Sequence, residues 1–68
     1  MNAIEMFKSL GYECSKCYDR NRIIQYYNEQ KNEFVFWIKQ QEFSSSEFVI
    51  TVDEFKAIQK QMEELGWI

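Results

Sequence analysis

The stretch RIIQYYNEQKNEFVFWIK, residues 22–39, contains two runs of β-branched and aromatic residues separated by a short polar segment. Runs of this composition are typical of strands, and the polar segment between them suits a tight turn. The stretch therefore predicts a β-hairpin at the centre of the chain. If the hairpin turns at Gln30-Lys31, Tyr27 lies opposite Phe34, and alternate residues point to opposite faces of the sheet.

This register gives the two faces of the hairpin different compositions. The face with Tyr27, Phe34 and Phe36 carries the larger apolar groups, so we expect it to pack against helices. The other face carries a candidate interaction surface, which comprises Ile24, Tyr26, Val35 and Trp37, bordered by Arg22 and Lys39. A slip of one residue would exchange the two faces.

A short helix is predicted near the N-terminus. Asn2 is placed to cap it, and Glu5, three residues further on, completes a capping-box pattern. The apolar residues then recur at helical spacing, at Ala3, Met6, Phe7 and Leu10. Gly11 follows where a helix-ending residue with positive φ belongs.

The C-terminal region repeats this pattern more fully. Thr51 and Glu54 form a second capping box, and Ile50 and Phe55 are placed as the hydrophobic staple around it. We expect the buried stripe of this helix to comprise Phe55, Ile58, Met62 and Leu65. Gly66 is placed to end the helix.

Two further segments are weaker strand candidates: YECSKCY, residues 12–18, and QEFSSS, residues 41–46. With them the order of elements is α-β-β-β-(β)-α. We therefore predict a single α+β domain over residues 1–68. Its sheet is an antiparallel meander of three to four strands, with the N-terminal and C-terminal helices packed on one face.

The composition narrows the classes of function. The chain has 68 residues, 11 acidic and 8 basic side chains, no histidine and a net charge of −3. Nucleic-acid-binding surfaces are usually strongly basic, so a nucleic-acid partner is disfavoured. No apolar run approaches the ~20 residues of a membrane helix, and the first residues lack the charged-then-apolar pattern of a signal peptide. We expect a cytoplasmic protein with no membrane partner.

Cys14 and Cys17 form a C-x-x-C pair, a spacing found in zinc sites and in thiol–disulfide enzymes. Structural zinc needs four Cys or His ligands, so only a site shared by two chains is open to this pair. In an extended strand the two Cα atoms would be roughly 10 Å apart, beyond disulfide reach. A first hairpin turn at Arg20-Asn21 directs Tyr12, Cys14 and Tyr18 toward the core and Cys17 toward the other face. We therefore interpret Cys14 as a small core residue.

No combination of residues predicts catalysis. Histidine, the commonest general base, is absent, and no Ser or Cys nucleophile has an evident partner. Both glycines are placed at helix ends, which leaves no phosphate-binding loop. We therefore expect a non-enzymatic protein without a cofactor or a metal.

The aromatic sheet face is the remaining candidate site. Tyr, Trp and Arg are common in binding hot spots, which favours a protein-interaction module that binds another protein or forms a homodimer. Aromatic residues on an open sheet beside Arg22 and Lys39 also suit the stacking of single-stranded nucleic acid, which is the alternative function. A third interpretation is that the loop from Ser46 to Ile50, or the N-terminal helix, covers this face.

The opening segment MNAIEMFKSLGYE and the closing segment ITVDEFKAIQKQMEELGWI are similar to those of a family of small phage and prophage proteins of low-GC Gram-positive bacteria. The matching residues are Leu10-Gly11-Tyr12, Ile50-Thr51, Glu54-Phe55, Ala57-Ile58 and Glu64-Leu65-Gly66-Trp67. Phe55 stands where the family usually has leucine, and the middle of the chain agrees only in the order of elements. The family has no assigned enzyme activity. The resemblance implies an accessory phage protein of the bacterial cytoplasm that binds, and inhibits or redirects, a host or phage protein.

Overall fold

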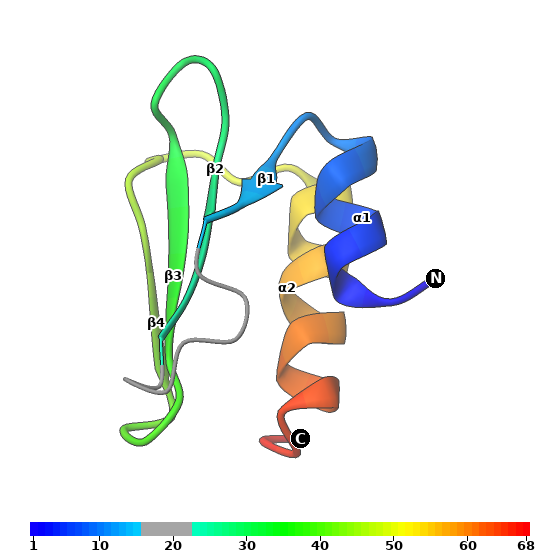
Figure 1. Ribbon diagram of the computed structural model, residues 1–68, viewed down its shortest axis with the longest axis vertical. Helices are drawn as coiled ribbons and strands as arrows, with labels where there is room; N and C mark the ends of the chain where they lie inside the picture. Colours follow the sequence, from blue (N-terminus) through cyan, green and yellow to red (C-terminus); the bar gives the residue numbers. More distant parts are fainter. Residues whose placement is uncertain (16–22) are drawn as a thin grey trace.

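The computed structural model describes residues 1–15 and 23–68. Four strands form one antiparallel sheet in the order β1-β2-β3-β4, and both helices lie on the same face of it (Figure 1). The elements are α1 (Ala3–Ser9), β1 (Glu13–Cys14), β2 (Ile23–Tyr27), β3 (Glu33–Trp37), β4 (Glu42–Ser45) and α2 (Val52–Glu64). The predicted α+β fold, with a four-stranded meander between two helices, is confirmed.

Both helices begin with the predicted capping boxes. Glu5 N–H donates to Asn2 Oδ1 at 2.8 Å, and Asn2 N–H donates to Glu5 Oε1 at 2.9 Å. Glu54 N–H donates to Thr51 Oγ1 at 3.0 Å, and Thr51 N–H donates to Glu54 Oε1 at 2.8 Å. These bonds satisfy backbone donors that a helix N-terminus otherwise leaves unpaired.

The predicted glycine ends are also confirmed. Gly11 and Gly66 have φ values of 91° and 76°. This backbone conformation costs glycine little, because it has no Cβ. After Gly11, Tyr12 N–H returns to Phe7 O at 3.0 Å, and after Gly66, Trp67 N–H returns to Met62 O at 2.9 Å. The two chain reversals carry Tyr12 and Trp67 back onto the core.

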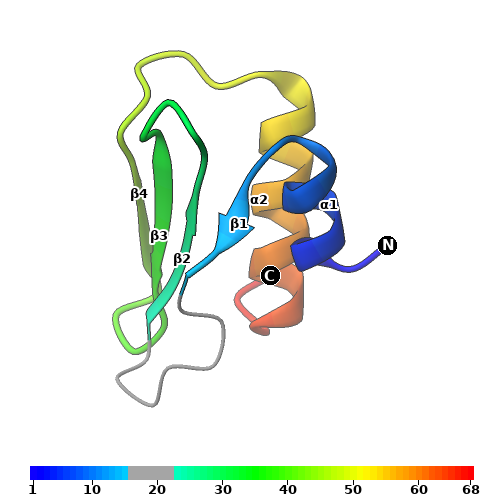
Figure 2. The same ribbon diagram turned by 45° about the horizontal axis from the view of Figure 1, so that its top comes forward.

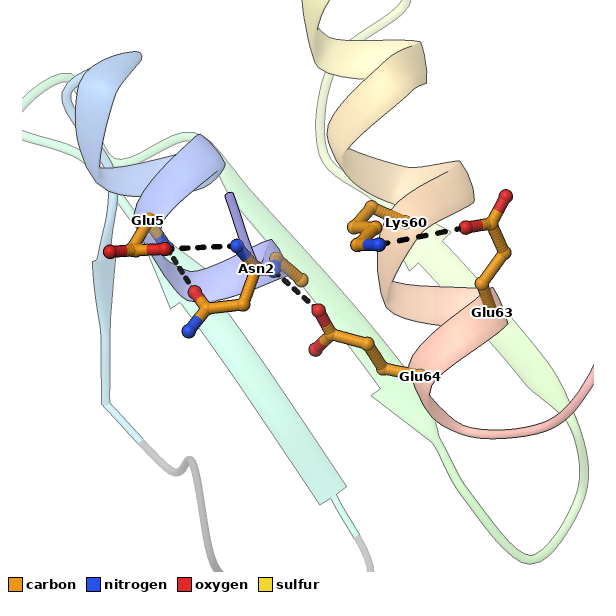
Figure 3. Close-up of polar contacts among 6 residues, drawn as sticks. Asn2, Glu5, Lys60, Glu63 and Glu64 are labelled. Atoms are coloured by element: carbon orange, nitrogen blue, oxygen red, sulfur yellow. Dashed lines mark hydrogen bonds and ion pairs between the residues drawn. The ribbon is translucent and has the colours of Figure 1, made fainter.

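A hydrogen bond connects the N-terminus of α1 with the C-terminus of α2. Glu64, the last residue of α2, accepts a hydrogen bond at its Oε2 from the backbone N–H of Ala3 at 2.8 Å (Figure 3). Ala3 is the first residue of α1, so its N–H has no partner within the helix and lies at the positive end of the helix dipole. A carboxylate from α2 therefore holds a helix of only seven residues in place.

The register of the central hairpin differs by one residue from the prediction. Tyr27 pairs with Glu33 and Tyr26 pairs with Phe34, because the turn contains three residues where two were expected. Asn28 N–H donates to Asn32 O at 3.1 Å, and Lys31 adopts a φ of 65°. This is the geometry of a three-residue hairpin turn with its last residue left-handed, a position usually held by glycine.

The one-residue slip exchanges the faces of β2 while those of β3 stay as predicted. Ile24 and Tyr26 join Phe34 and Phe36 in the core, together with Phe7 of α1 and Ile58 of α2. The ring of Phe7 stacks on that of Tyr26, with the centroids 3.9 Å apart and an angle of 17° between the planes. Edge-on and tilted contacts to Tyr12, Phe34 and Phe36 surround the same ring. One side chain of α1 thus lies at the centre of the core.

The buried stripe of α2 also differs from the prediction. Its buried residues are Glu54, Ala57, Ile58 and Gln61, whereas Met62 and Leu65 are half-buried and Phe55 is 58% exposed. Two polar residues replace Phe55 because buried tyrosine hydroxyls satisfy them: Tyr26 donates to Gln61 Oε1 at 2.5 Å and Tyr12 donates to Glu54 Oε2 at 2.8 Å. A hydrogen-bonded polar group costs little to bury, and the spacing of apolar residues in the sequence cannot predict which polar residues find such a partner.

The expectation that Cys14 forms no disulfide is wrong, because the residue is disulfide-bonded. The expected separation from Cys17 assumed an extended strand, but β1 ends at Cys14 and the next residue lies in a bend. Cys14 does pack against the core, as predicted. The expectations for Cys17, Tyr18 and the Arg20-Asn21 turn concern residues outside those described.

Candidate functional site

The four residues of the predicted interaction surface do not share a face. Ile24 and Tyr26 are buried under the helices, whereas Val35 and Trp37 lie on the opposite face of the sheet. The three-residue turn is the physical reason, because it moves β2 by one position relative to β3. Lys39 is exposed in the turn that follows β3, and Arg22 lies outside the described residues.

The sheet face that the helices leave open is mixed in character. Tyr27 and Trp37 expose about two fifths of their surface there, and Val35 lies buried between the neighbouring strands. The strand pairing places Glu13, Glu33 and Glu42 on the same face. Gln25 Nε2 donates to Glu33 Oε2 at 2.7 Å, and Tyr27 Oη donates to Glu13 Oε2 at 3.2 Å. Three carboxylates around two aromatic rings make a poor surface for a polyanion.

Among the described residues, the largest group of exposed apolar side chains lies in the connection from β4 to α2 and in the first turn of α2. Five of the eight residues from 48 to 55 belong to it. Their exposed fractions are 105% for Phe48, 79% for Val49, 38% for Ile50, 71% for Val52 and 58% for Phe55. We call these five residues the β4–α2 apolar segment. Figure 2 shows the connection crossing from the sheet layer to the helix layer at one end of the molecule.

Val52 and Phe55 are one helical turn apart, so their side chains lie on the same side of α2. Phe48, Val49 and Ile50 directly precede the N-cap residue Thr51. The predicted staple between Ile50 and Phe55 would hide both side chains, but Phe55 is largely accessible and Ile50 is partly so. An exposed apolar group of this size in a small domain indicates an interaction surface.

Hydrogen bonds hold the backbone of the segment on both sides. Before it, Glu47 N–H donates to Ser45 Oγ at 3.0 Å. After it, the capping box fixes Thr51, and Glu54 is held in turn by the buried hydroxyl of Tyr12. The apolar side chains are therefore displayed on an anchored loop, which reduces the entropy lost on binding.

A pair of carboxyl groups lies beneath the segment. Glu54 is buried, which raises its pKa, but hydrogen bonds from the Thr51 backbone, Tyr12 and Glu47 outweigh that effect and lower it below the ordinary value. The pKa of Glu47 is raised, first by burial and then by its hydrogen bond to Glu54. Burial and the adjacent Glu54 also raise the pKa of Tyr12, so its hydroxyl keeps its proton.

The opposite shifts mean that, as the pH falls, Glu47 takes up a proton before Glu54 does. Glu47 Oε2 is buried and has no hydrogen-bond partner in the part of the chain that the structure describes. The Glu54 carboxylate is directed inward, where it accepts hydrogen bonds from Tyr12 and Thr51.

Within the described residues, a metal site and a catalytic hollow are the other candidates to consider. Among residues 1–15 and 23–68 there is no group of three or more Cys, Asp or Glu side chains placed to hold a metal ion. A hollow beside the β2–β3 turn is lined by Leu10, Gly11, Glu13 and residues 27–30, and none of these lining residues is a Ser, Thr, Cys or Lys nucleophile. None of the helices within the described ranges has the length and apolar composition needed to cross a membrane.

No protein-family model, curated protein or solved structure matches the chain. The β4–α2 apolar segment was missed by the sequence reasoning, although EFVITVDEF, residues 47–55, contains the signal for it. Five apolar residues lie there within eight positions, more than one helix start can bury. The capping-box pattern accounts for two of them, Ile50 and Phe55, and for none of the other three.

Proposed function

We propose that this chain is a non-enzymatic protein-interaction module that binds its partner through the β4–α2 apolar segment. The observation that carries the proposal is the exposure of Phe48, whose ring lies entirely in solvent on a loop that is anchored on both sides. A folded chain of this size gains nothing in stability from such a ring. It gains binding energy if a partner buries it.

The size of that gain supports a specific complex. Complete burial of one Phe or Val side chain is worth about 1.5–3 kcal/mol. Phe48, Val49, Val52 and Phe55 are each more than half exposed, so together they can supply several kcal/mol against the cost of association. Aromatic side chains at the centre of a contact are typical hot spots, which places Phe48 and Phe55 first in the order of importance.

The resemblance to small phage and prophage proteins supplies the biological side of the proposal. In that context the module acts in the bacterial cytoplasm, where it binds a host or phage protein and inhibits or redirects it. A surface that consists of one short segment suits this role, because it needs only one complementary apolar groove on the partner.

The test is affinity capture from bacterial lysate with three baits: the wild-type chain, Phe48→Ser with Phe55→Ser, and a control with Tyr27→Ser and Trp37→Ser on the open sheet face. We expect the first double variant to lose a stoichiometric partner that the control retains, and the purified partner to bind the wild-type chain directly in a calorimetric titration. Capture that survives the loss of both phenylalanines would refute the proposal.

Single-stranded nucleic acid is a second candidate partner, supported by the exposed rings of Tyr27 and Trp37 on the open sheet face. Glu13, Glu33 and Glu42 on the same face oppose it. A fluorescence titration with oligonucleotides at low salt tests this alternative, because stacking on Trp37 would quench its emission in a salt-dependent manner. An unchanged emission would exclude this use of the sheet face.

A further inference from the structure

We infer that the β4–α2 apolar segment binds a second copy of this chain, in a symmetric dimer whose α2 helices meet in opposite directions at their first turns. This inference rests on the proposed function, since it concerns the same surface: the dimer is reversible, and a host or phage protein binds the segment only after the two copies separate. Three features of the described residues support a second copy over an unrelated protein: the area of the segment, the charges at its rim, and the position of the buried charge beneath it.

The area of the segment fits a dimer. An aromatic side chain exposes roughly 200 Å² when free, and weighting the five side chains by their exposed fractions gives roughly 600 Å² of apolar surface. Two such surfaces in contact would bury at most roughly 1,200 Å², which reaches the lower end of the range for specific protein–protein interfaces. The segment can therefore form a reversible dimer without recruiting another part of the chain.

The rim of the segment is complementary to itself. Asp53 and Lys56 are both exposed on α2, three residues apart, on either side of Glu54 and Phe55. In a two-fold arrangement every contact occurs twice, with the roles of the two copies exchanged. When two α2 helices run in opposite directions about an axis near Phe55, Asp53 of each copy faces Lys56 of the other. The only ion pair within residues 1–15 and 23–68 joins Lys60 and Glu63 (Figure 3). Asp53 and Lys56 therefore remain available for an ion pair between two copies.

The carboxyl pair beneath the segment removes an electrostatic obstacle. Each copy has a net charge of −3, so two copies repel one another unless the contact itself is close to neutral. Glu54 is directed inward, away from the contact, where it accepts hydrogen bonds from Tyr12 and Thr51, and the raised pKa of Glu47 favours its neutral form. The rim charges of Asp53 and Lys56 balance one another. The surface that meets the second copy is thus apolar at its centre and balanced in charge at its rim.

The decisive experiment is a charge exchange across the dimer, followed by sedimentation velocity from low-micromolar to sub-millimolar concentration. Because the dimer is two-fold symmetric, each of the variants Asp53→Lys and Lys56→Asp places two pairs of like charges at the interface. Each is therefore expected to weaken dimerisation by about tenfold or more. The double variant Asp53→Lys with Lys56→Asp restores opposite charges and is expected to recover the wild-type dimer. Far-UV circular dichroism confirms that every variant keeps its helices, since these changes also alter the charge in the first turn of α2.

Two further variants separate the possible failures. Phe48→Ser with Phe55→Ser is expected to give a monomer, and Trp37→Ser on the open sheet face is expected to leave the dimer intact. A wild-type chain that stays monomeric at all concentrations would refute the dimer and leave the proposed function to the capture experiment. A dimer that survives the loss of both phenylalanines, or that gains nothing from the charge exchange, would refute the interface. A dimer lost with Trp37 would move the interface to the sheet face.

Discussion

Replacing Phe7 by alanine removes the ring through which α1 contacts the sheet, and the structure gives the size of the effect. Phe7 is completely buried and contacts four aromatic rings, those of Tyr12, Tyr26, Phe34 and Phe36. A buried Phe→Ala change costs about 3–5 kcal/mol, and a stacked pair such as Phe7–Tyr26 adds about 0.5–1.5 kcal/mol. Because α1 is short and has one other buried residue, Ala3, little can move in to fill the cavity.

The expected loss is comparable with the whole stability of the domain. At about 0.05–0.15 kcal/mol per residue, 68 residues give a free energy of unfolding of about 3–10 kcal/mol. We therefore expect Phe7→Ala to be partly or largely unfolded at 25 °C. Phe7→Leu keeps more of the volume but also loses the stacked ring, so it should destabilise the domain clearly less than Phe7→Ala does. Urea unfolding, followed by far-UV circular dichroism and tryptophan fluorescence, measures both variants.

The matched control is Phe48→Ala, because Phe48 is fully exposed whereas Phe7 is fully buried. Phe48→Ala removes an identical side chain from solvent, so the free energy of unfolding should change by no more than about 0.5 kcal/mol. Both variants are compared at a concentration where sedimentation shows monomers, because dimerisation would add to the apparent stability. If Phe7→Ala costs less than Phe48→Ala, or less than about 1 kcal/mol, Phe7 is not the centre of the core.

Three other predictions follow from particular residues. Because the pKa of Glu47 is raised, its contribution to stability is complete below the unfolded pKa and is lost as the pH rises through the folded pKa. Glu47→Gln should remove this decline in a series of urea titrations at different pH values. Equal pH dependence in both proteins would contradict the prediction. Lys31→Gly should raise the free energy of unfolding by up to about 1 kcal/mol, because Lys31 has a φ of 65°. Gly11→Ala should lower it by about 1 kcal/mol, because alanine is strained at a φ of 91°. Thermal melting checks the sign of both changes. Alkylation of the native protein without a reductant should leave Cys14 unmodified in peptide mass spectra, whereas an adduct there would show a free thiol.

Local signals in the sequence predicted most of the fold. Capping boxes at Asn2 and Thr51 and glycines at 11 and 66 identified both helices with their ends, because a helix terminus is specified by residues within four positions of it. The strand runs around residues 23–27 and 33–37 were equally clear, because β-branched and aromatic residues favour extended backbone wherever they lie.

The predicted interaction surface failed because it depended on one turn. A two-residue and a three-residue turn at Asn28–Asn32 differ by a single position, and the left-handed residue of the real turn is Lys31, which carries no glycine signal. That difference exchanged the two faces of β2 and moved Ile24 and Tyr26 into the core. The β4–α2 apolar segment was hidden for a related reason, because exposure depends on what the rest of the chain covers.

The sequence by itself determined the order of elements, the helix ends and the α+β class, since these depend on contacts between residues close together in the chain. Only the tertiary structure decided which side chains are buried. Glu54 and Gln61 entered the core because Tyr12 and Tyr26, 42 and 35 residues away in the chain, supply their hydrogen bonds. Phe48 and Phe55 stayed outside it, although they are among the most apolar residues of the chain. Burial depends on how the whole chain packs, and the surface available for binding therefore depends on it too.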